Sequence, residues 1–492
     1  MCYALRRGTE GTPIRPNARP QAGGCSARFR VVASHCATQR CGRARCRVVA
    51  QGAVMNNPRH ILRPLCLVWA LLLLFGPTPF VRGQAAQFGN ASNPLRVRSD
   101  FPGGSAKVLS LDLTNRVIRI TPAGDPDRGW PCWWYLRLDG VDTNQALVLE
   151  VVGNEARGQG NNPGQNPKLN ANWSLPTRAA ISMDGRSWEN TAPGVRQGKQ
   201  MTYRVKSTAR TLWLAWGPPF TLQDANELIA KAAKLNPAAK PFELARTRAG
   251  RPVPGLRVSQ PGTAEPERFG IWVQARQHAW ECGSSWVICG LTEWLVSDDP
   301  IARSLREKAD ITIVPIMDVD SVETGNGGKQ QRPHDQNRDW GTAPHFPEVQ
   351  AGMNQVSALA KAGRLDVFLD LHNPGAGEQG VFIYIPPRPL LDEIRLANQT
   401  AFTNLMRAKI TGPIPFTGRV GPCGETYDPA VDKSVDAWAA NEGGSHVVSL
   451  TIETAWNNPA STPAGYRQVG EQIGRTIEAY VLGAPMRSRL RK

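Results

Sequence analysis

The chain has 492 residues, of which 41% are hydrophobic and 20% are charged, so it resembles an ordinary globular protein with room for two or three domains. Its net charge is +17, but residues 1–54 hold ten arginines and one acid, and residues 55–83 hold three arginines and no acid. Only five net positive charges remain for the rest of the chain, which argues against a protein that binds nucleic acid.

A signal-peptide pattern begins at Met55. Two arginines precede an apolar run at residues 65–75, and small or neutral residues up to Gly83 suit cleavage by a signal peptidase. The apolar run is too short to span a bilayer. We interpret residues 55–83 as a signal peptide and residues 1–54 as an untranslated or disordered upstream segment. The mature chain is then exported, periplasmic or extracellular, without a transmembrane segment. The alternative is one longer chain with an N-terminal anchor.

Short strands are predicted between residues 88 and 220. Apolar β-forming residues alternate or cluster in six segments, separated by Gly-, Asn- and Pro-rich sequence. The segments are RVIRITP, WWYLRLDGV, ALVLEVVG, AAISMDG, MTYRVKS and TLWLAWG. They predict an all-β sandwich, and we assign residues 84–235 to this domain. A helix is expected at 221–236, followed by a Pro-rich connector at 237–255.

Beyond residue 250, buried apolar strands alternate with helices. Strands are predicted at 269–276, 311–318, 365–372 and 446–454, and helices at 284–296, 355–363 and 465–483. This alternation predicts an α/β domain, residues 236–492, with a largely parallel or mixed sheet. Ligand sites in such sheets lie at the carboxyl ends of the strands.

Ionisable residues follow these strands at that position. His278 and Glu281 follow the first strand, the run RPHDQNRDW (332–340) follows the second, and His372 and Glu453 end two later strands. Catalytic zinc takes three protein ligands and leaves one position for water, which two histidines and one carboxylate satisfy. A further carboxylate can take a proton from that water. Glu453 suits this task, because its apolar surroundings raise the pKa of a carboxyl group.

The segments HAWE, NRDW, DLH and IET resemble those of the M14 zinc metallocarboxypeptidases. The chain is most similar to the cytosolic-carboxypeptidase-like branch, in which a β-sandwich precedes the catalytic domain, and the resemblance covers residues 90–485. It implies a carboxypeptidase-type mixed sheet flanked by helices, and one Zn²⁺ per chain. It also implies hydrolysis of the C-terminal peptide bond of peptides or proteins by zinc-activated water, with Glu453 as the general base.

The resemblance also implies the binding residues. His278, Glu281 and His372 match the zinc ligands of the family. Asn337 and Arg338 match the pair that holds the terminal carboxylate of the substrate, a task for which the planar guanidinium is suited.

Three further positions follow from the same resemblance. Asp335 matches the acid that orients the first zinc histidine. Lys329 and Arg332 are both candidates for the cation that polarises the scissile carbonyl, and the sequence does not choose between them.

The chain departs from the family pattern in two places. The usual HPGE is HAWE here, and we expect the bulky Trp280 to narrow the cleft beside the metal. The usual tyrosine that closes over the substrate is missing from SVDAWAANEGG (434–444), so Trp438 or Tyr427 is a candidate to replace it. Arg419 is a candidate to bind an acidic terminal side chain.

Several tryptophans and cysteines are expected to have structural roles. Trp130, with its neighbours Trp133 and Trp134, is expected to pack within the sandwich. Outside the upstream segments the cysteines are Cys132, Cys282, Cys289 and Cys423. Their three possible pairings are not distinguished by the sequence.

Two other functions fit parts of the pattern. One is a zinc amidase or deacylase that acts on a small non-peptide amide, with the same fold and ligands. The other is a non-catalytic protein that binds peptide or glycan. The sequence indicates no oligomeric state.

Overall fold

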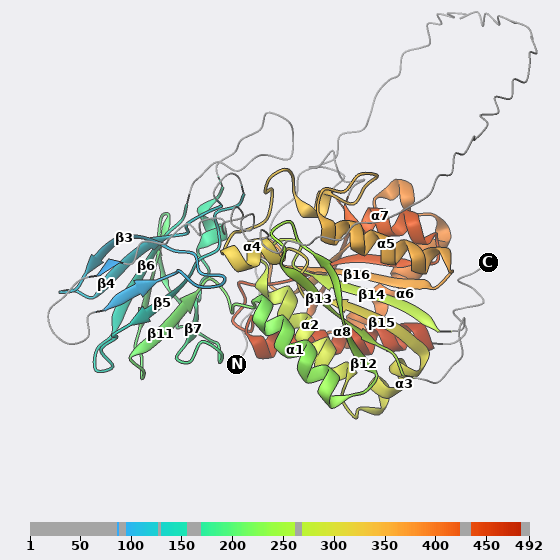
Figure 1. Cartoon of the computed structure of the whole chain (residues 1–492), viewed down its shortest axis with the longest axis horizontal. Coiled ribbons are helices and arrows are strands. Elements are labelled where there is room, and N and C mark those ends of the chain that lie inside the picture. Colours follow the sequence, from blue (N-terminus) through green and yellow to red (C-terminus); the bar gives the residue numbers. More distant parts are fainter. Residues whose placement is uncertain are drawn as a thin grey trace, which may run out of the picture. The chain divides into compact units, whose positions relative to one another are not determined.

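The computed structural model of the chain describes residues 86–87, 95–125, 129–154, 169–260, 268–423 and 434–483 (Figure 1). The upstream segment and the signal peptide expected at 1–54 and 55–83 lie outside the described residues, as does Tyr427. Within the described ranges, no helix combines the length and the apolar character needed to cross a membrane.

Two β-sheets form the described part of the chain before residue 217. The first has the order β1 (Ala86–Gln87), β2 (Arg96–Arg98), β5 (Tyr135–Asp139), β11 (Thr211–Ala215), β7 (Ala180–Ser182) and β8 (Glu189–Asn190). The second has the order β3 (Lys107–Asp112), β4 (Val117–Thr121), β6 (Leu147–Val152), β10 (Gln200–Val205) and β9 (Val195–Gln197). Every second residue of β6 and β10 is buried, as expected for strands with one face on a core. The two sheets share one apolar core, so the predicted β-rich domain is confirmed.

A third sheet, mixed and eight-stranded, is formed by strands after residue 238 (Figure 1). Its order is β12 (Ala239–Arg246), β13 (Pro252–Val258), β15 (Ala309–Val314), β14 (Phe269–Ala275), β16 (Leu365–His372), β19 (Val448–Thr454), β17 (Val381–Ile385) and β18 (Phe416–Pro422). The four central strands β15, β14, β16 and β19 run parallel, whereas β13 and β17 run antiparallel to these neighbours. The predicted mixed sheet is therefore confirmed.

Eight α-helices accompany this sheet in the described part of the chain. They are α1 (Leu222–Leu235), α2 (Cys282–Leu295), α3 (Pro300–Lys308), α4 (Val319–Thr324), α5 (Pro347–Lys361), α6 (Glu393–Lys409), α7 (Val435–Gly443) and α8 (Pro463–Leu482). Helices α5 and α7 pack together, and α8 packs against α2 and α6 (Figure 1). Local sequence determines where α3 begins. The Asp299 side chain accepts hydrogen bonds from two backbone amides of this helix, and Pro300 is its first residue.

Helix α2 is buried over nearly its whole length and lies in close contact with α8. A Cβ atom on Gly290 would lie 1.9 Å from the carbonyl oxygen of Arg467, and one on Gly470 would lie 1.9 Å from that of Val287. Only glycine permits such an approach of two helix backbones. This contact holds α2, which begins directly after Glu281, against α8.

The prediction of a connector at 237–255 is wrong, because this segment contributes to the hairpin of β12 and β13 at the edge of the mixed sheet. Pro252 and Pro254 lie in the half of β13 that pairs with β12 only, and β15 pairs with residues 256–258. Proline is tolerated where a strand is free of a second neighbour. The proline content therefore concealed two strands.

Helix α1 packs with the mixed sheet. Leu228 and Ile229 are buried in the same core as the strands β14 and β16, not in the core of the sandwich. The four cysteines outside the upstream segments are all buried and free, so no disulfide joins them in the described structure.

Candidate active site

The candidate site lies at the carboxyl ends of three neighbouring parallel strands. His278 and Glu281 lie in the short loop between β14 and α2, and His372 is the last residue of β16. Glu453, near the end of β19, is the register partner of His372. Because parallel strands end at the same edge of a sheet, residues far apart in the chain meet there.

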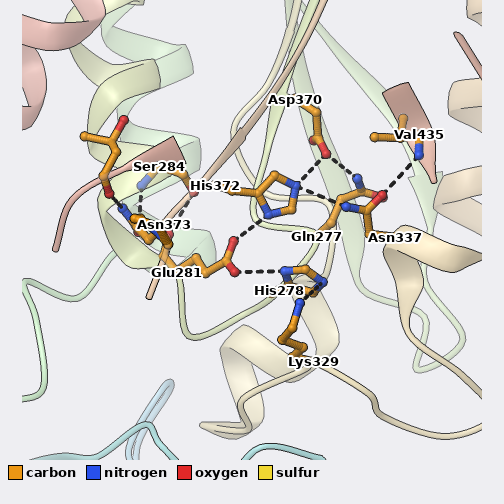
Figure 2. Close-up of polar contacts among 12 residues, drawn as sticks. Gln277, His278, Glu281, Ser284, Lys329, Asn337, Asp370, His372, Asn373 and Val435 are labelled. Carbon is orange, nitrogen blue, oxygen red and sulfur yellow. Dashed lines mark hydrogen bonds and ion pairs between the residues drawn. The ribbon is translucent and has the colours of Figure 1, made fainter. Parts of the chain in front are cut away.

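A buried glutamate joins two buried histidines at this edge (Figure 2). The Nδ1 atom of His278 lies 2.8 Å from Glu281 Oε1, and the Nδ1 atom of His372 lies 2.7 Å from Glu281 Oε2. One ligand atom from each of the three residues lies within 4.8 Å of the other two. Two imidazoles and a carboxylate form the donor set that zinc prefers.

The opposite ring nitrogens are held by two further carboxylates. His278 Nε2 lies 2.9 Å from Asp335 Oδ1, and His372 Nε2 lies 2.6 Å from Asp370 Oδ2. A carboxylate on one nitrogen fixes the tautomer and the orientation of a metal-binding histidine. Both rings are thus turned so that their Nδ1 atoms face Glu281.

Asp370 was missed in the sequence analysis. It receives a hydrogen bond from Gln277 Nε2 at 2.6 Å (Figure 2). A second comes from Gln274 Nε2 at 3.2 Å. The signal was present in the strand-end segment DLH, because residues two apart on a strand project from the same face. The position of Asp370, two residues before His372 at the end of a strand, was therefore enough to predict that it orients this histidine.

Asn373 ties two elements of the site together. Its side-chain oxygen accepts a hydrogen bond from the backbone amide of Ser284 at 3.3 Å, and its side-chain nitrogen donates to the Thr454 carbonyl at 2.6 Å (Figure 2). The first turn of α2 is therefore linked to the end of β19. Asn373 therefore connects the segment that carries Glu281 to the segment that carries Glu453.

The electrostatics of the cluster favour a cation. Burial alone would raise the pKa of Glu281, but the two neighbouring histidines outweigh it and lower this pKa to about 2. Burial lowers the pKa of both histidines, and the carboxylates outweigh it: Asp335 and Glu281 for His278, and Asp370 and Glu281 for His372. Buried carboxylates in such number require compensating positive charge. The donor set and its charge therefore fit a zinc ion.

Glu453 occupies a different environment. Burial is the main cause that raises its pKa to about 7; the charge of Glu281 acts in the same direction, and the charges of His372 and Lys329 oppose it. Its side chain is half-buried, yet Oε2 is fully buried and accepts no hydrogen bond within the part of the chain that the structure describes. This carboxyl oxygen can accept a proton.

Asn337 and Arg338 lie in a short 3₁₀ helix, η2 (Gln336–Arg338), next to His372. Asn337 Nδ2 lies 3.3 Å from His372 Nε2, and Asn337 Oδ1 accepts a hydrogen bond from the Val435 amide at 3.1 Å (Figure 2). The half-buried Arg338 donates to the Asn337 carbonyl at 2.8 Å. Burial would raise the pKa of Asp335, but His278, with smaller contributions from Lys329 and Arg338, holds this pKa well below its usual value.

The structure separates the two candidates for the polarising cation. Lys329 is half-buried, and its Nζ atom lies 3.5 Å from His278 Nε2 (Figure 2). Arg332 is exposed. Lys329 is thus the one of the two that the loop brings to the cluster.

The expectation that Trp280 narrows the cleft is wrong. Its side chain is 1% exposed and lies in an aromatic cluster with ring centroids 5.5 Å from Trp173, 5.3 Å from Trp216 and 6.3 Å from Trp456. Trp173 and Trp216 belong to the sandwich, so Trp280 joins the two cores. Each such aromatic pair contributes about 0.5–1.5 kcal/mol beyond the area it buries.

Trp438 and Arg419, the candidates for closing over the substrate and for binding an acidic side chain, contact other residues than the metal ligands. Trp438 packs its ring 5.3 Å from that of Trp340 and is partly buried against the core of the mixed sheet. Arg419 is exposed, forms an ion pair with Glu378 and lies 4.1 Å from the ring centroid of Phe382.

Two family models match the chain. One, described as zinc carboxypeptidase, matches residues 225–373, and the other, described as the N-terminal domain of cytosolic carboxypeptidases, matches residues 97–216. Together they match more than half of the chain. The first includes His278, Glu281 and His372, whereas Glu453 lies beyond its end.

Curated proteins are similar to more than half of the chain. An uncharacterised protein of Zymomonas mobilis is 27% identical over 285 residues, which cover 57% of this chain and 68% of that protein. Cytosolic carboxypeptidase 4 of Homo sapiens is 25% identical over 325 residues, which cover 60% of this chain. The match spans only 29% of that human protein.

Solved structures share the fold. A metallo-carboxypeptidase from Burkholderia cenocepacia has a TM-score of 0.66 and 25% identity, with coverage of 79% of this chain and 99% of that one. A metallo-carboxypeptidase from Pseudomonas aeruginosa has a TM-score of 0.65 at 21% identity, with coverage of 80% and 100%.

A mixed α/β sheet with a buried His–Glu–His cluster at its strand ends defines a zinc-dependent hydrolase of the metallocarboxypeptidase class. The chain belongs to the M14 family of zinc carboxypeptidases and carries the N-terminal domain of the cytosolic carboxypeptidases.

Replacing Asp370 should weaken metal binding, because His372 would lose the carboxylate that orients it. We expect Asp370→Asn to lower zinc affinity by about 10–100-fold, measured by competition with a chromogenic chelator. Asp366→Asn is the matched control: Asp366 is buried on the same strand and bonds the Gly270 amide, away from the histidines. Equal zinc affinity in Asp370→Asn and the wild type would contradict the orienting role.

Proposed function

We propose that the chain removes residues from the carboxyl termini of peptides or proteins. The observation that carries this proposal is the buried Glu281 carboxylate between two histidine Nδ1 atoms, with Glu453 beside it. When bound there, zinc would supply a water molecule activated for attack at neutral pH. His278, Glu281 and His372 would hold the ion.

Glu453 is the proposed general base and acid. With a pKa near 7 it can take a proton from the attacking water and return it to the leaving amine at the same pH. Its buried Oε2 supports this role, because no group in the described part of the chain donates a hydrogen bond to that oxygen.

Arg338 and Lys329 are proposed to act on the substrate. A guanidinium can hold the free terminal carboxylate by two parallel hydrogen bonds, which would restrict cleavage to the chain end. Asn337 is proposed to support it, although its side chain also contacts His372 and Val435. Lys329, beside His278, would stabilise the negative charge that develops on the carbonyl oxygen.

We also propose that the chain has two domains. The sandwich is followed by the catalytic domain, and the packing of α1 against the mixed sheet favours a boundary before residue 222 rather than after residue 235. Peptide or protein substrates follow from the family.

Replacing Glu453 should separate catalysis from metal binding. Glu453→Gln keeps the shape of the side chain but removes its capacity to carry a proton, so we expect kcat to fall by about 10²–10⁴-fold while one zinc per chain remains. Elemental analysis and steady-state kinetics on a pooled peptide mixture measure both. The exposed Glu189→Gln is the control. Retained turnover in Glu453→Gln would refute the proposed role.

A free terminal carboxylate should be required. We expect the wild type to cleave a free-acid peptide roughly 10–100-fold better in kcat/KM than the same peptide as an amide, the value of a charge-assisted hydrogen bond. Arg338→Ala should remove this preference, whereas the exposed Arg332→Ala should keep it. A wild-type enzyme that cleaves both peptides equally would favour a zinc amidase instead.

We propose export on the basis of residues 55–83, although several relatives, such as the human one, are named cytosolic carboxypeptidases. Expression of the full chain should yield an exported protein whose first residue lies just after Gly83, as determined by N-terminal sequencing. A mature protein that begins upstream of Met55 would contradict the proposal.

A further inference from the structure

We propose that the β-sandwich is part of the catalytic apparatus, because its residues Asp125 and Trp130 position Lys329. This inference rests on the proposed role of Lys329 at the substrate carbonyl. Neither sandwich residue contacts the metal ligands in the structure; both act through the loop Gly325–Gln331, which carries Lys329 between α4 and η2.

Asp125 holds the backbone of this loop. Its Oδ1 atom accepts a hydrogen bond from the Gly327 amide at 2.6 Å, and its Oδ2 atom accepts one from the Gly328 amide at 3.4 Å. A Cβ atom on Gly327 would lie 2.1 Å from the carbonyl oxygen of Trp130, so the loop backbone lies directly against the sandwich. Hydrogen bonds from backbone amides to a carboxylate are of the stronger, charge-assisted kind.

Trp130 contacts both Lys329 and its neighbour Gln330. Its indole Nε1 donates a hydrogen bond to Gln330 Oε1 at 3.0 Å, and the Lys329 ammonium lies 5.4 Å from the centroid of its ring. This distance permits a cation–π attraction. Trp130 was expected to pack within the sandwich, and its contact with a residue 200 positions away was not foreseen.

The backbone of the loop is strained at this point. Gln330 has φ = 54°, a left-handed conformation that is uncommon for a residue other than glycine. Such a conformation persists only where surrounding contacts determine it, and it occurs most often at functional sites. Here the Gln330 amide donates to Asp335 Oδ2 at 3.2 Å, and its side chain accepts from Trp130.

The same loop is tied to the metal-ligand loop. The Trp280 amide donates a hydrogen bond to the Gly327 carbonyl at 3.1 Å. Gln331 Nε2 donates to Asp318 Oδ2 at 2.6 Å, which also ties the loop to the start of α4. Asp125 thus binds the loop from the sandwich at the same glycine that Trp280 binds from the catalytic domain. The position of Lys329 relative to His278 depends on both attachments.

A double-mutant cycle between Asp125 and Lys329 tests the inference, since a residue that acts through Lys329 loses its effect when Lys329 is gone. We expect Asp125→Ala to lower kcat/KM about 10–100-fold. Lys329→Gln should lower it about 10²–10³-fold, and the double variant should equal Lys329→Gln. Zinc content and the thermal unfolding midpoint are measured for each variant. Asp125→Asn, which keeps one acceptor, should recover part of the activity, and the exposed sandwich variant Asp112→Ala should match the wild type.

The outcomes separate the inference from the proposed function. If Lys329→Gln impairs turnover and Asp125→Ala does not, the proposed function stands and the inference is refuted. Equal losses from Asp125→Ala in both backgrounds would show a merely structural role and also refute it. If Lys329→Gln is fully active, the role of Lys329 fails and the inference fails with it.

Trp130→Phe gives a second check that carries little risk to folding. The ring beneath Lys329 is kept, while the hydrogen bond to Gln330 is lost. We expect kcat/KM to fall several-fold in the wild-type background and to stay unchanged in the Gln330→Leu background. A loss of equal size in both backgrounds would contradict the contact as the cause.

Discussion

The position of the Glu281 carboxylate between two histidine nitrogens is the constraint on which the rest of the site depends. It requires the loop after β14 and the end of β16 to meet at one edge of the sheet, and it requires α2 to begin directly after Glu281. The close glycine contact between α2 and α8 fixes that helix. Asp335 and Asp370, on the outer nitrogens, then leave the inner nitrogens facing a common point. The fold therefore presents a preformed metal site.

The second constraint is the contact between the sandwich and the catalytic domain. Trp280, between two of the metal ligands in sequence, is buried among tryptophans of the sandwich, so the ligand loop packs on a rigid aromatic surface. The neighbouring loop that carries Lys329 is held by Asp125 and Trp130 from the same domain. The loop that carries His278 and the loop that carries Lys329 are thus both supported by the sandwich.

The sequence predicted what depends on local pattern. Strands that end in His372 and Glu453 were recognisable from apolar runs that stop at an ionisable residue. Asp370 was recognisable in principle, because it shares a strand face with His372. The role of Asp125 could not be recognised from the sequence. Its partners lie about 200 residues away, and no local periodicity marks a contact between loops. The hairpin at 237–255 was misread because prolines suggest a connector, and only the tertiary pairing shows that they lie where a strand has one neighbour.

A crystal structure with anomalous diffraction measured at the zinc edge tests the metal site most directly. The predicted result is one anomalous peak per chain, about 2.0–2.1 Å from Nδ1 of both His278 and His372 and about 2.0–2.2 Å from a carboxylate oxygen of Glu281. Coordination through the Nε2 atoms, or a peak that does not involve Glu281, would contradict the arrangement in which Asp335 and Asp370 orient the two rings.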